Sequence, residues 1–569
     1  MFYDLKVSVS PSDSSLSGSN RIRYKVLEET GNMEDKTPER SKKAPGSRMD
    51  VPSPMIKAPG SRMDVPTPMT KAPGSMIDVP TPMIKAPGST MKVLNSAIEM
   101  QIDLMAPLQL DSVVQEGRQL TYRRDGDAYF IQMAAPQNKE EEKEIYLYYH
   151  GRPRVARNAP WDGGIVWGRD SLGRRWVASA CQGLGASVWW PCKDLQADEP
   201  DSQRITLTVP QDMIAVSNGR LEQEKQEGGL ATYIWMVRNP INNYNVALNA
   251  GSYVHFGDTY AGEDGRLSLD YWPLDYNLKK AEKQFEQVKS MLNCFEHWFG
   301  PYPWYKDGYK LVETPHLGME HQSCIAYGNR YMNGYLGSDL SHTGWGLKWD
   351  FIIVHESGHE WFGNNITTKD IADMWVHEAF TTYSEALYVE CLFGKEAGAQ
   401  YARGMMWNIK NDRPVTGHYG VHEEGSGDMY NKGAGMLHTI RQIINDDTKW
   451  RNLLRGLGET FRHQTVTGAR IQEYISAQSG IDFTRVFQQY LTTTQIPLLE
   501  YKIAGNRLSY RWRQVVEGFD MPVRVYRADG SPVLIYPSAS WKTLDNFRLQ
   551  RKQLKVDDNF FIRTKKSPV

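Results

Sequence analysis

The 569-residue chain lacks several features that define whole classes of protein. It contains no run of about 18 apolar residues, so the sequence predicts no membrane-spanning helix. Its five cysteines are too few, and odd in number, for a disulfide-stapled scaffold of this length. It also lacks an excess of either charge: Lys and Arg total 66 against 67 Asp and Glu. This balance argues against a nucleic-acid-binding protein, which normally carries a basic excess or patch.

The N-terminus lacks the parts of a signal peptide. No basic segment, apolar stretch and small-residue cleavage site precede the alternation of Leu5, Val7 and Val9, which predicts a strand. As written, the sequence predicts a cytoplasmic protein. A truncated N-terminus would equally allow a periplasmic or secreted one, in which Cys181 and Cys192 could pair rather than stay as buried thiols. The localisation therefore stays open.

The clearest feature of the N-terminal region is a tandem repeat of 14 residues. It starts at Lys43, recurs from Lys57 and Lys71, and has a partial copy from Lys85. Three prolines in each copy exclude a helix or a paired strand and favour an extended, polyproline-like segment. We interpret 28–91 as a disordered insertion in a surface loop, because long loops add little closure entropy. A proline-rich arm that binds a partner is the alternative.

The flanks of the repeat alternate in the manner of strands. Apolar residues occupy every second position from Ile22 to Val26 and again from Ile98 to Leu104. Excising the repeat would connect these two segments directly. We therefore predict that the insertion separates two neighbouring strands of one sheet.

The remaining chain divides into three segments by hydrophobic period. Short alternating strands dominate 1–255, helical spacing dominates 256–496, and alternation returns in 497–569, where Asp529-Gly530 predicts a hairpin turn. Within the middle segment, apolar residues from Leu278 to Phe299 recur at intervals of three and four, which predicts one amphipathic helix ended by Gly300-Pro301. These patterns predict an α+β multidomain protein.

One motif in the middle segment carries the chemistry. The segment reads His355-Glu356-Ser357-Gly358-His359. On a helix the two histidines differ by ~40° in azimuth, so both can reach one metal ion. Glu356 lies in the same sector, where it can act as a general base without binding the metal. An ordinary helix with two unrelated histidines is the alternative for an isolated match of this kind.

A catalytic zinc site needs a third protein ligand. Glu378 lies on a second helical pattern that follows the helix-breaking Gly363, and an antiparallel return would turn it toward the two histidines. The adjacent His377 is a competing candidate, but it points ~100° away from Glu378 on a helix. We therefore predict His355, His359 and Glu378 as the ligands of one zinc ion per chain.

These residues also carry a family resemblance. His355-Glu356-x-x-His359, eighteen intervening residues and Glu378 resemble the signature of the gluzincin zinc metallopeptidases of the aminopeptidase N family. The adjoining segment Glu360-Trp361-Phe362-Gly363-Asn364 also resembles the corresponding segment of that family.

Three further motifs resemble the family in the same order along the chain. Gly318-Met319-Glu320 resembles the exopeptidase motif, which implies that Glu320 binds the free α-amine of a substrate. Gln182 matches the position of a second amine-binding residue. Tyr430, in Tyr430-Asn431-Lys432-Gly433, matches the family's oxyanion-stabilising tyrosine.

Two departures from the family pattern stand out beside Glu320. Leu317 replaces a glycine, and His321 replaces an asparagine. An unperturbed histidine titrates near pH ~6.5. We therefore predict that protonated His321 weakens the binding of the substrate ammonium on acidification; a His321 that points away from Glu320 is the alternative.

The resemblance implies a fold and an activity. It implies an N-terminal β-domain, a thermolysin-like catalytic domain and a small C-terminal β-sandwich, without the helical C-terminal domain of larger members. It implies a zinc-dependent aminopeptidase that removes N-terminal amino acids from peptides, with Glu356 as general base and Tyr430 as oxyanion donor. A non-catalytic peptide-binding protein and a zinc endopeptidase are the alternatives. Relatives in the leukotriene-hydrolase branch also open epoxides, so a second activity stays open.

Overall fold

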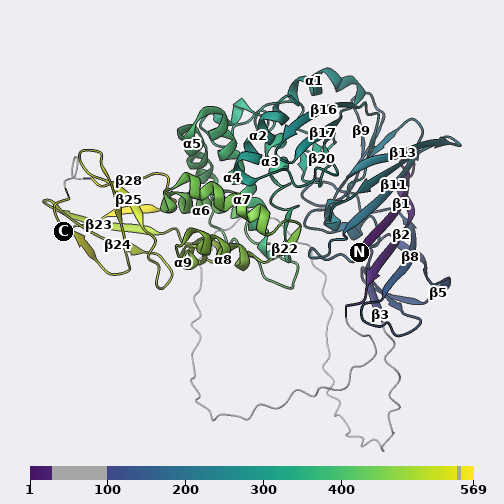
Figure 1. Cartoon of the computed structure of the whole chain (residues 1–569), viewed down its shortest axis with the longest axis horizontal. Helices are drawn as coiled ribbons and strands as arrows, with labels where there is room; N and C mark the ends of the chain where they lie inside the picture. The colour runs from purple at the N-terminus through teal and green to yellow at the C-terminus, as the bar shows by residue number, and fades with distance from the viewer. Residues whose placement is uncertain (28–98, 548–552, 569) are drawn as a thin grey trace, which may run out of the picture.

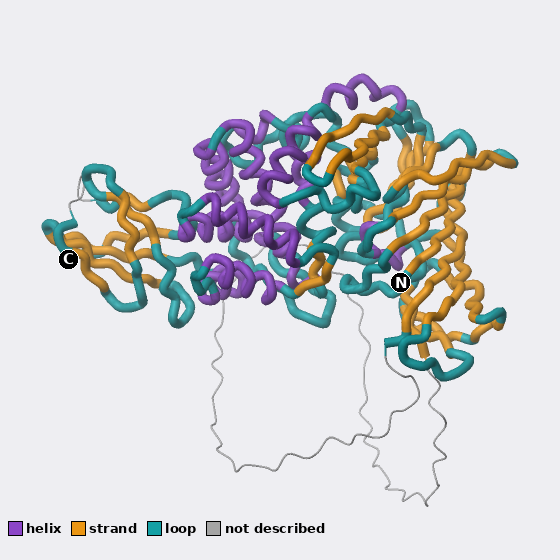
Figure 2. Tube along the Cα trace, in the orientation of Figure 1, coloured by secondary structure: helices purple, strands orange, loops and turns teal. Residues whose placement is uncertain are grey.

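The computed structural model describes residues 1–27, 99–547 and 553–568. The proline-rich repeat and the predicted insertion at 28–91 lie outside the described residues. Figure 1 and Figure 2 show three parts in sequence order: a β-rich N-terminal part, a central helical part and a β-rich C-terminal part. The chain therefore has the α+β multidomain architecture that was predicted.

The N-terminal part contains three sheets in the described residues, and buried residues alternate with more exposed ones along central strands of the largest sheet. In β11 the side chains of Ile205, Leu207 and Val209 are buried, and the residues between them are less so. The eight-stranded sheet has the order β13 (Arg220–Glu227), β14 (Leu230–Val237), β11 (Ser202–Pro210), β1 (Phe2–Ser10), β2 (Ser15–Lys25), β8 (Glu142–Gly151), β4 (Gln109–Gln115) and β5 (Arg118–Leu120). A three-stranded sheet contains β3 (Glu99–Asp103), β7 (Ala128–Gln132) and β6 (Tyr122–Asp125). A four-stranded sheet contains β12 (Ile214–Val216), β15 (Asn249–Gly251), β10 (Arg175–Ala180) and β9 (Gly164–Arg169).

The strands that flank the repeat do not neighbour each other, so that prediction was wrong. Strand β2 pairs with β1 and β8, whereas β3 pairs with β7 in a different sheet. Alternation along a strand reports which face is buried, and it contains no information about which strand lies beside it.

The central part begins with a mixed sheet and continues with helices. The five-stranded sheet has the order β16 (Phe256–Gly262), β17 (Gly265–Trp272), β18 (Tyr309–Glu313), β20 (Ile325–Tyr327) and β19 (Gly318–Met319). The helices are α1 (Leu278–Gln284), α2 (Gln287–Phe299), α3 (Phe351–Gly358), α4 (Trp375–Phe393), α5 (Lys395–Met405), α6 (Asp428–Ile444), α7 (Asp447–Thr460), α8 (Gly468–Ser479) and α9 (Thr484–Thr492). Strands β21 (Ile366–Thr368) and β22 (Gln464–Val466) form a parallel pair.

The helical pattern from Leu278 to Phe299 forms two helices rather than one. Helix α1 ends at Gln284 and α2 starts at Gln287, while Gly300, with φ of 88°, ends α2 as expected. A disulfide between Cys294 and Cys391 joins α2 to α4. Cys181 and Cys192 are free and buried, so they are not paired with each other.

The C-terminal part consists of two small sheets that face the end of the helical part (Figure 2). One contains β27 (Lys542–Leu544), β24 (Arg507–Arg513), β23 (Leu498–Ala504) and β29 (Arg563–Lys566); the other contains β26 (Pro532–Ile535), β25 (Val523–Tyr526) and β28 (Lys555–Val556). The predicted hairpin turn joins β25 to β26. We propose that 1–255, 256–496 and 497–569 are the three domains, because new sheets begin at β16 and at β23.

No helix in the described ranges combines the length and the apolar character that crossing a lipid bilayer requires.

Candidate active site

Helix α3 positions the first part of the site. Asp350 caps its N-terminus by accepting hydrogen bonds from the backbone N–H groups of Ile352 and Ile353. Every residue of the helix is buried, which explains its nearly continuous apolar sequence. The helix ends at Gly358, so His355 lies in its last turn and His359 is the residue that follows.

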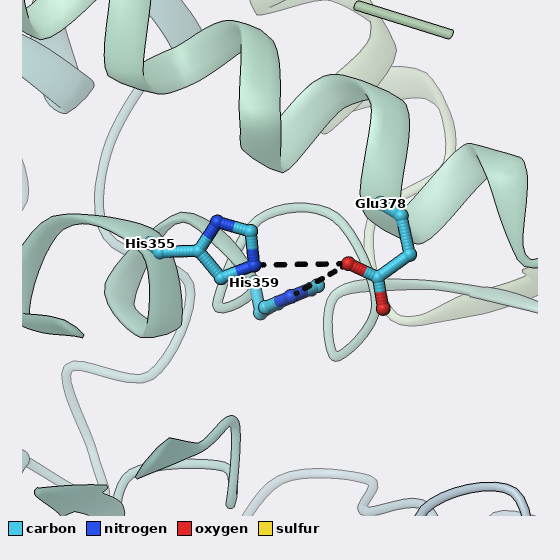
Figure 3. A group of neighbouring side chains, drawn as sticks. All are labelled: His355, His359 and Glu378. Carbon is cyan, nitrogen blue, oxygen red and sulfur yellow. Dashed lines mark ion pairs between the residues drawn. The ribbon is translucent and has the colours of Figure 1, made fainter. Parts of the chain in front are cut away.

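Helix α4 brings a carboxylate to the two imidazoles. Glu378 Oε2 lies 3.7 Å from His355 Nε2 and 3.4 Å from His359 Nε2 (Figure 3). The three side chains are almost fully buried. The predicted ligand set therefore converges on one point from two helices.

The opposite ring nitrogens of the histidines are held in place. His359 Nδ1 lies 3.0 Å from the carbonyl oxygen of Phe362, which can only accept, so Nδ1 carries the proton. His355 Nδ1 lies 2.7 Å from Glu385 Oε1, and Tyr401 donates its hydroxyl to the other oxygen of that carboxylate. Both Nε2 atoms are consequently available as metal ligands.

These atoms fit a zinc ion. The ligand atoms of His355, His359 and Glu378 all lie within 4.8 Å of one another. Glu378 Oε2 is buried and has no hydrogen-bond partner in the described part of the chain. A buried acceptor without a partner is costly, and a cation between the two imidazoles and this oxygen would remove the cost. Two histidines and one glutamate form a donor set typical of catalytic zinc.

His377, the competing ligand candidate, faces away from this point. Its Nε2 accepts a hydrogen bond of 2.9 Å from the backbone N–H of Thr368 in β21. The helical argument that favoured Glu378 over its neighbour therefore agrees with the geometry.

Glu356 extends from α3 toward β19. A Cβ atom on Gly318 would lie 2.6 Å from Glu356 Oε1, so only glycine leaves room for this carboxylate. Burial raises the pKa of Glu356 above its ordinary value. Gly318 and Met319 form β19 itself, directly before Glu320, so the exopeptidase motif and the metal motif are in contact.

Glu320 is held by two donors from the N-terminal part of the chain. Gln182 Nε2 donates to Glu320 Oε1 at 2.8 Å and to Glu378 Oε1 at 3.1 Å. The hydroxyl of Tyr244 donates to the same Glu320 oxygen at 3.3 Å. Asn364, after α3, donates to the Glu320 backbone carbonyl at 2.9 Å. The predicted amine-binding residues thus lie together, beside the predicted metal ligands.

Sequence reasoning missed three of these partners. Glu385 lies seven residues after Glu378 on α4, and this spacing of two helical turns could have indicated it. Tyr244 and Tyr401 are distant in sequence and follow no motif, so no signal in one sequence could have found them.

The predicted pH sensitivity of His321 was wrong. The side chain is fully buried, and neither ring nitrogen has a hydrogen-bond partner among the described residues. Burial and the neighbouring His316 lower the pKa of His321 to about 3. The imidazole is therefore neutral throughout the pH range in which the prediction required it to titrate.

We expect His321→Asn to leave the pH dependence of KM unchanged for a substrate with a free amine. A pKa lowered this far keeps His321 uncharged from about pH 5 to about pH 8, so it contributes no charge there. KM measured across this range in both proteins checks the expectation. A rise in KM on acidification that disappears in the variant would contradict it.

Tyr430 lies in the first turn of α6, opposite α3. Its ring stacks near that of His355, with the centroids 6.0 Å apart. Burial, followed by the charges of Glu378 and Glu320, raises the pKa of Tyr430 well above 10. The phenol consequently stays protonated and available as a hydrogen-bond donor at neutral pH.

A single cavity of about 680 Å³ joins all of these groups. Its lining includes every predicted site residue: Gln182, Gly318, Met319, Glu320, His355, Glu356, His359, Glu378 and Tyr430. A ligand in this cavity can touch the two imidazoles, the Glu356 carboxylate and Glu320 at once. The site therefore has the donor set and the neighbouring carboxylate found in metallopeptidases of the two-histidine, one-glutamate class.

Comparisons with known proteins agree with the resemblance found in the sequence. Residues 283–490 match the peptidase family M1 domain. This match includes the two histidines and Glu378, and zinc is the metal that an M1 zinc metallopeptidase domain implies.

Curated relatives match the chain at low identity. The probable aminopeptidase 2 of Sulfurisphaera tokodaii is 20% identical over 418 residues, which is 71% of this chain and 51% of that protein. The leucyl aminopeptidase of Saccharolobus solfataricus is 21% identical over 58% of this chain and 43% of its own length. The tricorn protease-interacting factor F2 of Thermoplasma volcanium is 22% identical over 58% of this chain and 42% of its own length. The chain thus spans about half the length of the curated relatives it matches.

A solved structure covers more of the fold. The M1 zinc metallopeptidase of Deinococcus radiodurans superposes with a TM-score of 0.65 at 18% identity, over 87% of this chain and 94% of that one. A variant of that enzyme bound to a Tyr-Ser-Ala substrate gives a TM-score of 0.64 at the same identity. This likeness establishes the fold.

Proposed function

We propose that the protein is a zinc-dependent aminopeptidase that removes single amino acids from the free N-terminus of peptides, with one zinc ion per chain. The observation that carries the proposal is the hydrogen bonding of Gln182 to both Glu320 and Glu378. It ties a carboxylate suited to a substrate ammonium to the carboxylate suited to the metal. A peptide whose amine binds Glu320 would therefore place the carbonyl of its first residue beside the metal that Glu378 would hold.

His355, His359 and Glu378 would hold the zinc ion. When bound, zinc supplies a Lewis acid that polarises a carbonyl oxygen and makes water a stronger nucleophile at neutral pH. Glu385 and Phe362 fix the imidazoles by their Nδ1 atoms, so the Nε2 atoms face the ion without a change of rotamer.

Glu356 would act as the general base and then as the general acid. Its carboxylate would accept a proton from the attacking water and deliver it to the amine that leaves. Because burial raises its pKa, this carboxylate is a stronger base than an exposed glutamate. Gly318 supports this role by leaving space for the side chain.

Glu320 would bind the α-ammonium group of the first residue. Gln182 and Tyr244 both donate to its Oε1, which leaves Oε2 to accept from the substrate. This anchor would set the register, since only a peptide with a free amine places its first peptide bond at the metal. Tyr244 and Asn364 act here through Glu320, as positioning residues.

The test of the function compares a free with an N-acetylated aminoacyl-arylamide, with and without a zinc chelator. We expect hydrolysis of the free substrate alone, and its loss on chelation. Cleavage of the acetylated substrate would instead favour an endopeptidase. A purified chain without bound zinc and without hydrolysis would favour the non-catalytic alternative.

We expect Tyr430→Phe to lower kcat by about 10²–10³-fold while KM changes by no more than about threefold. The phenol would donate mainly to the negative charge that develops in the transition state, so its loss leaves ground-state binding intact. Steady-state kinetics on one arylamide provide the measurement. An effect confined to KM would assign Tyr430 to substrate packing instead.

A further inference from the structure

Acidic side chains predominate among the charged residues that line the cavity. Within the described ranges, no lysine or arginine lines it. Its acidic lining residues are Asp162, Glu320, Glu356, Glu378, Glu385 and Glu424. Four of these have roles in the proposed function, as amine anchor, base, metal ligand and support of His355. Asp162 and Glu424 have none.

Glu424 is an exposed carboxylate at the cavity wall, four residues before α6. It forms no hydrogen bond or ion pair with any residue of the described chain. The titratable side chains near it are Arg413, His422 and Glu378. Arg413 lies 3.9 Å from the carboxylate of Glu423, and His422 contacts a backbone carbonyl. The carboxylate oxygens of Glu424 are therefore available at the cavity wall to accept hydrogen bonds from a ligand.

Asp162 adds negative charge to the cavity wall, but neither of its oxygens is both exposed and without a partner. Its Oδ2 accepts from the backbone N–H of Arg157 at 2.6 Å, and its Oδ1 is buried without a partner among the described residues. No ion pair neutralises it in the described chain. Negative charge in a concave, partly desolvated site raises the local concentration of cations.

Both carboxylates flank the turn that carries Gln182. His422 Nε2 lies 2.7 Å from the carbonyl oxygen of Gly183, which places the Glu424 segment against this turn. On the other side, a Cβ atom on Gly163 would lie 2.7 Å from Leu184 Cδ2, so the Asp162 loop packs on the same turn. The side chain of a first residue leaves from the carbon that bears the amine, so it starts beside Gln182, on the turn that both carboxylates flank.

We propose that the cavity selects peptides whose first residue is cationic, lysine or arginine, and that Glu424 accepts the hydrogen bond from this side chain. The proposal rests on the proposed function, because the amine at Glu320 sets the position of the first residue. An acidic first residue meets the carboxylates of Asp162 and Glu424 and is disfavoured by like-charge repulsion.

The first experiment compares arginyl-arylamide with citrullinyl-arylamide, whose side chains have nearly the same shape and differ in charge. We expect kcat/KM to favour arginine by about tenfold, since the contact is charge-assisted but partly exposed to solvent. Glu424→Gln should bring this ratio close to one. A ratio is unaffected by a general loss of folded enzyme.

Glu423→Gln is the matched control. Glu423 belongs to the same segment, contacts His418 at 2.8 Å, and is absent from the cavity lining. We expect this variant to keep the preference of the unmodified protein. A ratio near one in the unmodified protein, or one that Glu424→Gln leaves unchanged, overturns the proposal.

A binding measurement separates this proposal from the proposed function. Calorimetry on the zinc-loaded full chain gives the affinities for L-arginine and L-citrulline without turnover. Tighter binding of L-arginine that Glu424→Gln abolishes supports the cationic subsite even if no arylamide is hydrolysed, in which case the aminopeptidase activity alone is refuted. Equal affinities overturn the subsite.

Discussion

Glu356→Gln is expected to lower kcat by about 10²–10⁴-fold while the protein keeps its zinc. Glutamine has almost the same shape, so it occupies the space beside Gly318 and leaves α3 undisturbed. Its amide cannot accept a proton from water, so the step that needs a base is lost. Steady-state kinetics, together with zinc content measured by elemental analysis, check both halves of this expectation.

The control for this variant is its thermal stability, which should match that of the unmodified protein. Among the described residues, the carboxylate of Glu356 forms no side-chain hydrogen bond that the amide would lose, and its environment acts through burial and neighbouring charges. A kcat within about tenfold of the unmodified value would show that another group takes the proton.

Glu378→Ala is expected to abolish zinc binding itself, with a stoichiometry far below one and no measurable hydrolysis. The change removes one of the three proposed protein ligands, and it also removes the negative charge that lies 3.4 Å from His359 Nε2. Although burial opposes ionisation, the charges of His359 and His355 lower the pKa of Glu378, so this carboxylate is charged at neutral pH. Zinc binds histidine only in its neutral form, and two imidazoles without the Glu378 carboxylate form an incomplete site for a dication.

Glu385→Gln is the graded comparison for Glu378→Ala. Glu385 contacts the far nitrogen of His355 and would not touch the ion. Loss of such an outer contact typically weakens metal affinity by about 10–100-fold. Zinc titrations should therefore rank the unmodified protein first, Glu385→Gln second and Glu378→Ala last. Equal zinc affinities for the two variants would contradict the assignment of Glu378 as a direct ligand.

The candidate site could be predicted from sequence where its chemistry depends on local spacing. His355 and His359 lie four residues apart, which brings their rings to one side of a helix whatever surrounds it. The choice of Glu378 over His377 likewise followed from helical geometry, and the backbone contact of His377 agrees with it. Gly318, Met319 and Glu320 are contiguous, so a short motif could indicate them together.

Other features depend on contacts between distant segments, and the sequence predictions were wrong or silent there. His321 was expected to titrate because it lies beside Glu320, but burial lowers its pKa to about 3. Tyr244 reaches Glu320 from 76 residues away in the chain. Strand β3 was expected beside β2 and pairs with β7 instead. Burial and strand order are properties of the assembled core.

The sequence by itself determined the proposed metal-binding motif, the order of β and helical segments and the resemblance to a peptidase family, because these depend on residue type and on spacing within one helix or strand. Only the tertiary structure decided how Gln182 joins the carboxylates proposed to bind the amine and the metal, why His321 is neutral, and which acidic side chains line the cavity. The physical reason is that desolvation and charge pairing depend on every neighbour within a few ångströms, and those neighbours come from segments far apart in the chain.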